Sequence, residues 1–327
     1  MGDIVSLFQQ FLENNQQPSH DFRLFKYTDK LFLGVDKDGY VSIVCVSSMP
    51  NRSQLRQKTR LISIECNVKV NYCLDGETIQ NIVHVIRCYS TSQKEKNVFL
   101  ELVPLFEEAS NHDDQIASLL DTVSILSSFF ANKSEPSDSE LQGLYAELLA
   151  IKQYQSAISL GDYWQSNDRM KFDFSITDKV KVEVKSTTKN ERKHHFRHEQ
   201  LAHETYDIFV VSYMFRQDDE GTSLFDLIET VKPSVMSDPR RLITIEKYIK
   251  NTSEDRLRQC RFNEQLASYS RRIYKAQDIP RFAEQSPVGV TDAEYDCNLE
   301  TANSIDESDF ISFIQQSQSN NQEQNTD

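Results

Sequence analysis

The residues best suited to chemistry lie in two short, strand-like segments, residues 171–176 and 180–185. Asp173 stands between two phenylalanines in the first segment, and Glu183 and Lys185 alternate with valines in the second. Because side chains alternate between the two faces of a strand, Glu183 and Lys185 share the polar face. If the two strands pair as a hairpin, Asp173 meets Glu183 at the strand ends.

Two carboxylates that approach one another repel unless a cation joins them, and Mg²⁺ prefers such oxygen ligands. We therefore predict a metal site at Asp173 and Glu183. Lys185 is then placed to orient or activate a water, or to stabilise charge growing on a phosphate. Glu147 is a natural third ligand, since it interrupts an apolar helical pattern in which an unpaired carboxylate is costly to bury. A Glu-x-Lys strand is also common as a surface ion-pair ladder, and that alternative stays open.

The chain has 327 residues and a formal net charge of −14, which makes it a poor general binder of polyanions. Two local basic faces depart from this balance. Residues 179–198 hold seven Lys and Arg against two acids, and residues 240–283 hold eleven against five. They are either solvated faces or phosphate-binding faces, since base-independent affinity for nucleic acid comes from neutralising phosphates. The predicted DNA-binding residues are Arg192, Lys193, Arg197, Gln200, Arg271 and Arg272. For Gln200, and also for Ser186, the alternative expectation is that the side chain supports the acidic site by hydrogen bonding.

The periodicity of apolar residues predicts a mixed fold, with α+β and α/β character, in five segments. In chain order these are an N-terminal β-rich domain (1–103), a linking helix (104–136), a core that carries the acidic residues (137–216), a mostly helical accessory region with short strands (217–303) and an acidic, disordered tail (304–327). The tail is predicted because its Gln/Asn/Ser-rich composition offers few apolar groups to bury. Within the first domain, Asp38-Gly39 and Asp75-Gly76 predict hairpin turns.

The order of these parts resembles the PD-(D/E)XK nuclease superfamily. More closely, it resembles the bacterial PD-(D/E)XK-motif proteins of restriction and phage-defence gene clusters. The similar order is a helix with Glu147, a strand with Asp173, a strand with Glu183-Val-Lys185, a helix and a strand. The longer similar stretches are Gly143-Leu-Tyr-Ala-Glu-Leu-Leu, Trp164 before Phe172-Asp-Phe, Val182-Glu-Val-Lys-Ser-Thr-Thr, His195-Phe-Arg-His-Glu-Gln-Leu, Asp278-Ile-Pro-Arg-Phe and Pro287-Val-Gly-Val-Thr-Asp-Ala-Glu-Tyr. Phe172 replaces the proline of the motif, a residue that coordinates nothing.

The resemblance implies a central αβββαβ restriction-endonuclease-like core and an endonuclease that hydrolyses double-stranded DNA with Mg²⁺, or with Mn²⁺ in its place. The implied metal ligands are Asp173, Glu183, the carbonyl of Val184 and, directly or through water, Glu147. Lys185 is the implied catalytic lysine. Cutting both strands requires two sites, so a homodimer or a companion defence protein is expected.

Two other functions stay open. A catalytically inactive DNA-binding or scaffolding subunit suits the acidic total charge, and a nuclease for RNA or for a DNA junction uses the same type of core. No apolar stretch approaches the roughly 20 residues of a membrane span, and the N-terminus shows no secretory signal. We therefore expect a cytoplasmic protein that does not contact a membrane, with its six cysteines as free thiols.

Overall fold

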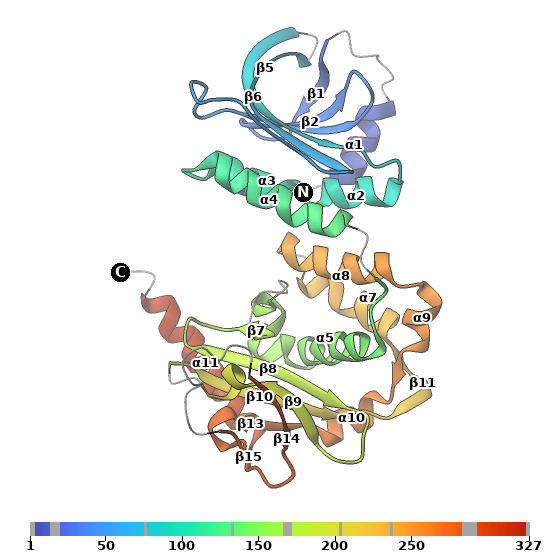
Figure 1. Cartoon of the computed structure of the whole chain (residues 1–327), viewed down its shortest axis with the longest axis vertical. Coiled ribbons are helices and arrows are strands. Elements are labelled where there is room, and N and C mark those ends of the chain that lie inside the picture. Colours follow the sequence, from blue (N-terminus) through green and yellow to red (C-terminus); the bar gives the residue numbers. More distant parts are fainter. Residues whose placement is uncertain are drawn as a thin grey trace. The chain divides into compact units, whose positions relative to one another are not determined.

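The chain folds into two compact units, residues 1–133 and 134–327. The computed structural model describes residues 4–13, 20–74, 77–131, 134–165, 172–202, 205–235, 238–282 and 293–324. Both units combine helices and strands, so the predicted mixed α/β class is confirmed (Figure 1). No helix within these described ranges is long and apolar enough to cross a membrane.

The first unit is built on a strongly curved sheet. Its elements are α1 (Ile4–Glu13), β1 (Phe22–Lys26), β2 (Leu31–Asp36), β3 (Val41–Val46), β4 (Leu55–Lys58), β5 (Ile62–Leu74), β6 (Glu77–Cys88), α2 (Gln93–Glu101), α3 (Val103–Asn111) and α4 (Gln115–Phe130). The strands pair in the order β1-β2-β3-β6-β5-β4. A parallel pairing of β1 with β5 closes five of these strands into a ring. β4 pairs only with β5, so it forms an open edge.

The predicted hairpin turn at Asp38-Gly39 is confirmed. It joins antiparallel β2 and β3, and Gly39 has a φ of +82°, a backbone conformation that other residues rarely adopt. Asp36 fixes the turn, because its Oδ1 accepts hydrogen bonds from the backbone N–H groups of Asp38 and Tyr40. The second predicted turn, at residues 75–76, lies outside the described residues, although β5 and β6 on either side of it pair antiparallel.

The structure replaces the predicted single linking helix, residues 104–136, with two helices that belong to the first unit. α3 ends at Asn111, and the backbone of His112 after it is extended. Asp114 then caps α4 by accepting a hydrogen bond of 3.3 Å from the N–H of Ala117. An aspartate at this position favours a new helix start, since it satisfies an N–H group that the helix itself leaves unpaired.

The second unit is built on a five-stranded sheet in the order β15-β13-β10-β8-β7 (Figure 1). Its first elements are α5 (Asp138–Ile158), the 3-10 helix η1 (Leu160–Tyr163), β7 (Phe174–Ser175), β8 (Val180–Thr187), β9 (Lys193–Arg197), α6 (His198–Leu201), β10 (Asp207–Met214), β11 (Gln217–Ser223) and α7 (Leu224–Val235). The remaining elements are α8 (Pro239–Asn251), α9 (Glu254–Gln259), β12 (Arg261–Phe262), α10 (Glu264–Ser270), β13 (Arg272–Lys275), the 3-10 helix η2 (Ala276–Asp278), β14 (Glu294–Asn298), β15 (Ser304–Ile305) and α11 (Glu307–Gln324). The two central strands, β8 and β10, run parallel, and the other pairs of this sheet are antiparallel.

Helix α5 begins at a reciprocal cap. Ser137 accepts a hydrogen bond from the N–H of Glu140, and the Glu140 carboxylate accepts one from the N–H of Ser137. This pairing satisfies two backbone groups at the start of the helix. α5 packs against β8, and the apolar residues around Glu147 on this helix are buried. The helix thereby carries Glu147 toward the sheet.

The predicted disordered tail, residues 304–327, is wrong for residues 304–324. β15 pairs antiparallel with β13, and α11 follows it directly. Phe310 and Ile314, one helical turn apart, are fully buried in the core of the second unit. Two apolar residues at this spacing are enough to dock a helix whose remaining side chains are mostly polar, so composition alone was misleading.

Candidate active site

Asp173 and Glu183 converge where β7 meets β8. The two strands pair antiparallel, with Phe174 opposite Val182, which confirms the predicted hairpin. Asp173 directly precedes β7, and its Oδ2 accepts a hydrogen bond of 2.7 Å from the backbone N–H of Val184. Burial raises the pKa of Asp173 well above its ordinary value, and repulsion from Glu183 raises it further. The hairpin therefore brings these two acids together.

Glu183 is the most enclosed member of this group, with 3% of the residue exposed. Its Oε1 lies 2.7 Å from the ammonium Nζ of Lys185 and accepts a hydrogen bond of 2.6 Å from the Nε2 of Gln200. Its Oε2 is buried and has no hydrogen-bond partner within the described part of the chain. Buried polar atoms normally have a partner, so this oxygen is suited to a ligand from outside the protein.

Glu147 reaches the same group from α5, which lies beside the sheet (Figure 1). Its Oε2 accepts a hydrogen bond of 2.7 Å from the indole Nε1 of Trp164. Burial raises the pKa of Glu147 to about 7; this hydrogen bond opposes the rise, and repulsion from Glu183 adds to it. Trp164 is buried, as expected of a core residue, and its polar edge also holds one of the acids.

Lys185 is the cation of the group. Burial disfavours its charge, but attraction from Glu183, Asp173 and Glu147 outweighs burial, so the pKa of Lys185 is raised. Its side chain is 22% exposed, so most of it is enclosed together with the acidic group. Lys185 is therefore a lasting positive charge beside the three acids.

The donor atoms fit a hard divalent cation such as Mg²⁺. Burial is the largest cause of the raised pKa values of Asp173 and Glu147, and repulsion from Glu183 adds to it; a bound cation would relieve that repulsion. Among the described residues, no three or more His, Cys, Asp or Glu side chains are arranged to hold a metal ion. A cation would thus draw at most two acids from the present arrangement, with carbonyl or water oxygens completing its shell.

A family model described as "Putative PD-(D/E)XK family member, (DUF4420)" matches residues 7–300. The chain belongs to this family. The match spans most of both units and includes the three acids and the lysine of the candidate site, which are Glu147, Asp173, Glu183 and Lys185. No curated protein and no solved structure matches the chain. Membership of the DUF4420 family indicates a nuclease-like protein, a class that typically uses divalent metals.

The structure places two of the predicted DNA-binding side chains in the interior. Arg192 is 2% exposed, and its guanidinium donates hydrogen bonds to the carbonyl and hydroxyl oxygens of Ser212 and to the carbonyl oxygen of Ser270. The prediction for Arg192 is therefore wrong, because a buried guanidinium with these partners does not reach a phosphate. Gln200 is also buried, and its amide supports Glu183 instead of facing solvent.

Lys193 and Arg197 lie on β9, a strand that the sequence did not predict. β9 pairs antiparallel with β14, and the short helix α6 (His198–Leu201) follows β9 directly. Both side chains are exposed, and each pairs with a carboxylate of β14. Lys193 Nζ lies 3.2 Å from Asp296, and Arg197 Nε lies 3.3 Å from Glu294.

The basic residues near β13 are also paired within the protein. Arg271 lies 2.5 Å from the Glu307 carboxylate at the start of α11, and only 15% of its side chain is exposed. Arg272 is more exposed and lies 3.4 Å from Glu300. These four cations, on β9 and near β13, consequently have carboxylate partners with which a phosphate would compete.

Sequence reasoning missed two residues that support the acidic group. Trp164 is the only tryptophan of the chain, and its hydrogen bond to Glu147 follows from a fold that local sequence does not reveal. Gln142 donates a hydrogen bond of 3.0 Å from α5 to the hydroxyl of Ser186, the residue after Lys185. No signal in the sequence marks Gln142.

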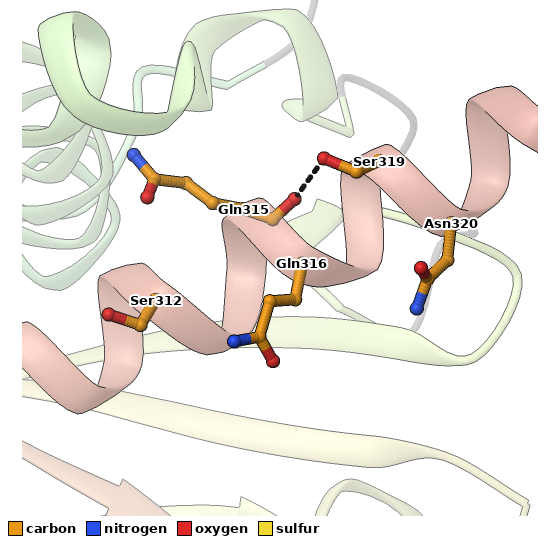
Figure 2. Close-up of a pocket in the computed structure, with 5 residues that line it drawn as sticks. All are labelled: Ser312, Gln315, Gln316, Ser319 and Asn320. Carbon is orange, nitrogen blue, oxygen red and sulfur yellow. Dashed lines mark hydrogen bonds between the residues drawn. The ribbon is translucent and has the colours of Figure 1, made fainter.

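An open polar pocket lies on α11 (Figure 2). Its lining residues are Ser312, Gln315, Gln316, Ser319 and Asn320. The hydroxyl of Ser319 donates a hydrogen bond to the backbone carbonyl of Gln315. The lining contains no charged side chain and none of the candidate site residues, so this pocket offers no comparable chemistry.

Proposed function

We propose that this protein is a metal-dependent endonuclease that hydrolyses phosphodiester bonds of double-stranded DNA. The observation that carries the proposal is the buried Oε2 of Glu183, which has no hydrogen-bond partner among the described residues and belongs to a carboxylate grouped with Asp173, Glu147 and the ammonium of Lys185. Membership of a nuclease-like family supports the same reaction class.

Each residue of the candidate site has a separate proposed role. Asp173 and Glu183, with the carbonyl of Val184, would hold Mg²⁺ or Mn²⁺, and Glu147 would act directly or through a water. When bound, such an ion polarises a phosphate and lowers the pKa of a coordinated water. Lys185 would orient the attacking water or stabilise negative charge on the phosphate, because the surrounding acids keep its ammonium protonated.

Two groups would keep the acids in place. The amide of Gln200 holds Glu183, and the indole of Trp164 holds Glu147. Positioning of this kind matters because small displacements of catalytic groups lower rates strongly.

The setting that we propose is bacterial defence, in a restriction or anti-phage system in the cytoplasm. The resemblance in sequence order to the motif proteins of such gene clusters supports it. Cutting a duplex requires two sites, so the active form would be a homodimer or a complex with a companion protein.

Cleavage of plasmid DNA with Mg²⁺ tests the mechanism. Wild type should cut, whereas Asp173→Asn and Lys185→Ala should lose most activity. Lys189→Ala is the matched control, since this exposed lysine follows β8 and lies outside the acidic group. Equal cleavage by all four proteins would refute the assigned roles, and cleavage of RNA in place of DNA would correct the substrate.

A second function is favoured by a specific observation. The described residues form no group of three metal-binding side chains, and Lys185 already neutralises Glu183. This arrangement would also suit a catalytically inactive DNA-binding or scaffolding subunit. Titration calorimetry with Mg²⁺ separates the two functions. A nuclease should show binding heat that Asp173→Asn removes, whereas an inactive core should show no heat that depends on these carboxylates.

A further inference from the structure

We propose that the first unit carries a binding surface for single-stranded nucleic acid. This surface, which we call the β4 surface, consists of Arg56, Lys58, Arg60, Tyr40 and Tyr89. It lies outside the candidate active site and does not depend on the proposed nuclease function.

The first observation is a concentration of positive charge on an exposed edge. Residues 49–62 contain four Lys and Arg residues and no acid, in a chain whose total charge is −14. All four residues of β4 are exposed. Arg56 has 64% of its side chain exposed, and Arg60 is exposed in the turn that follows. This edge is therefore a local exception to the acidic character of the protein.

The second observation is the aromatic pair beside these cations. Arg56 and Lys58 share one face of β4, because side chains alternate along a strand. The Nζ of Lys58 lies 4.5 Å from the centre of the Tyr89 ring. Tyr89 in turn contacts Tyr40 edge to face, with ring centres 4.8 Å apart, and Tyr40 is exposed. Cations beside an exposed aromatic ring are the combination that binds phosphates and stacks unpaired bases.

The third observation is that few carboxylates neutralise these cations. Arg56 lies 3.0 Å from Glu65, but Glu65 is shared with Arg87. Lys58 and Arg60 form no ion pair within the described part of the chain. Lys193 and Arg197 of β9 and Arg272 of β13, in contrast, each have a carboxylate partner.

Single-stranded nucleic acid fits the β4 surface better than a duplex does. Bases in a duplex are already stacked on one another, so Tyr40 adds nothing to phosphate contacts there, whereas it can stack on an unpaired base. Basic residues on an edge strand also prevent association with other strands. The experiment must therefore separate nucleic-acid binding from protection of the edge.

The test uses the full chain in EDTA and a fluorescently labelled single-stranded DNA of mixed sequence, with anisotropy as the readout. The triple variant Arg56→Gln, Lys58→Gln, Arg60→Gln should bind about tenfold more weakly or worse. Its dependence of log K on log salt should be shallower by about 2, since each lost phosphate contact to a single strand removes roughly 0.7. The matched control replaces three exposed lysines of the same unit, Lys26, Lys30 and Lys69, with glutamine.

Two further variants separate charge from stacking. Exchange of Arg and Lys at positions 56, 58 and 60 keeps the charge and should keep the salt dependence. Tyr40→Leu should weaken binding to the single strand several-fold and leave the salt dependence unchanged. Thermal unfolding of each variant checks that the fold is intact.

Unchanged affinity of the first triple variant, or an equal loss in the lysine control, would overturn the proposal. A loss of duplex affinity in the first triple variant as large as its loss of single-strand affinity would overturn the choice of ligand. If the triple variant self-associates and its affinity for single-stranded DNA is unchanged, the role of these cations is to prevent β4 from pairing with strands of other molecules. Because the assay measures binding and no cleavage, its results can be interpreted even if the nuclease proposal fails.

Discussion

Glu147→Gln should stabilise the metal-free protein at neutral and alkaline pH, although it removes a candidate catalytic residue. Gln keeps the shape of the side chain and can still accept the hydrogen bond from Trp164. It carries no charge, however, whereas burial raises the pKa of Glu147 to about 7 and Glu183 repels its ionised form. Ionisation of Glu147 therefore lowers the stability of the folded wild type, and the uncharged glutamine avoids this loss.

The magnitude follows from the two pKa values. An ordinary value of 4.5 and a value of about 7 in the fold correspond to roughly 3 kcal/mol, as an upper bound because neighbouring acids titrate together with Glu147. For an acid whose pKa is raised by folding, the unfolded chain releases its proton first as the pH rises. The wild type therefore loses stability relative to the variant between about pH 4.5 and about pH 7. Below that window the two proteins should be equally stable.

Urea unfolding in EDTA at about pH 4 and about pH 8 measures this difference. Trp164 is the only tryptophan and lies in the second unit, so its fluorescence follows the relevant transition. Glu229→Gln, at an exposed position of α7, is the matched control and should change stability little at either pH. Absence of stabilisation in Glu147→Gln at about pH 8, or an equal difference at both pH values, would refute the electrostatic reasoning.

Three other substitutions test the supporting structure. Gln200→Leu should lower Mg²⁺ affinity by roughly 10–100-fold in calorimetry, because it removes the amide that holds Glu183; unchanged affinity would exclude Gln200 from the site. Arg192→Met should lower the free energy of unfolding by about 3 kcal/mol, because it leaves buried oxygens unpaired, whereas Lys193→Gln at the next position, the start of β9, should cost less than about 0.5 kcal/mol. Equal urea midpoints for these two variants would contradict the assignment of Arg192 to the interior. Phe310→Ala should cost about 3–5 kcal/mol in the same titration; a loss below about 1 kcal/mol would mean that α11 is only loosely attached.

The residues of the candidate site were visible in the sequence because the signals that mark them are local. Alternation along a strand places Glu183 and Lys185 on one face, and a helical apolar pattern makes Glu147 conspicuous. The hairpin that brings Asp173 to this group also follows from neighbouring segments.

The errors arose where partners lie far apart in the sequence. Arg192 belongs to a basic run, and nothing local shows that Ser212 and Ser270 enclose its guanidinium. β9 is polar, and it is a strand because it pairs with β14, about a hundred residues later. Composition likewise concealed α11, whose attachment depends on Phe310 and Ile314.

Asp173 combines a candidate catalytic charge with hydrogen bonds that hold the local structure, two features that mutagenesis usually treats as separate. Its carboxylate accepts the N–H of Val184, and its backbone carbonyl accepts the N–H of Gln165, so the residue ties together three segments of chain. An alanine here would delete a charge and a tether at once, and an inactive alanine mutant would not reveal which loss was responsible. Asparagine can still accept the hydrogen bond from Val184, so Asp173→Asn tests the loss of the charge alone.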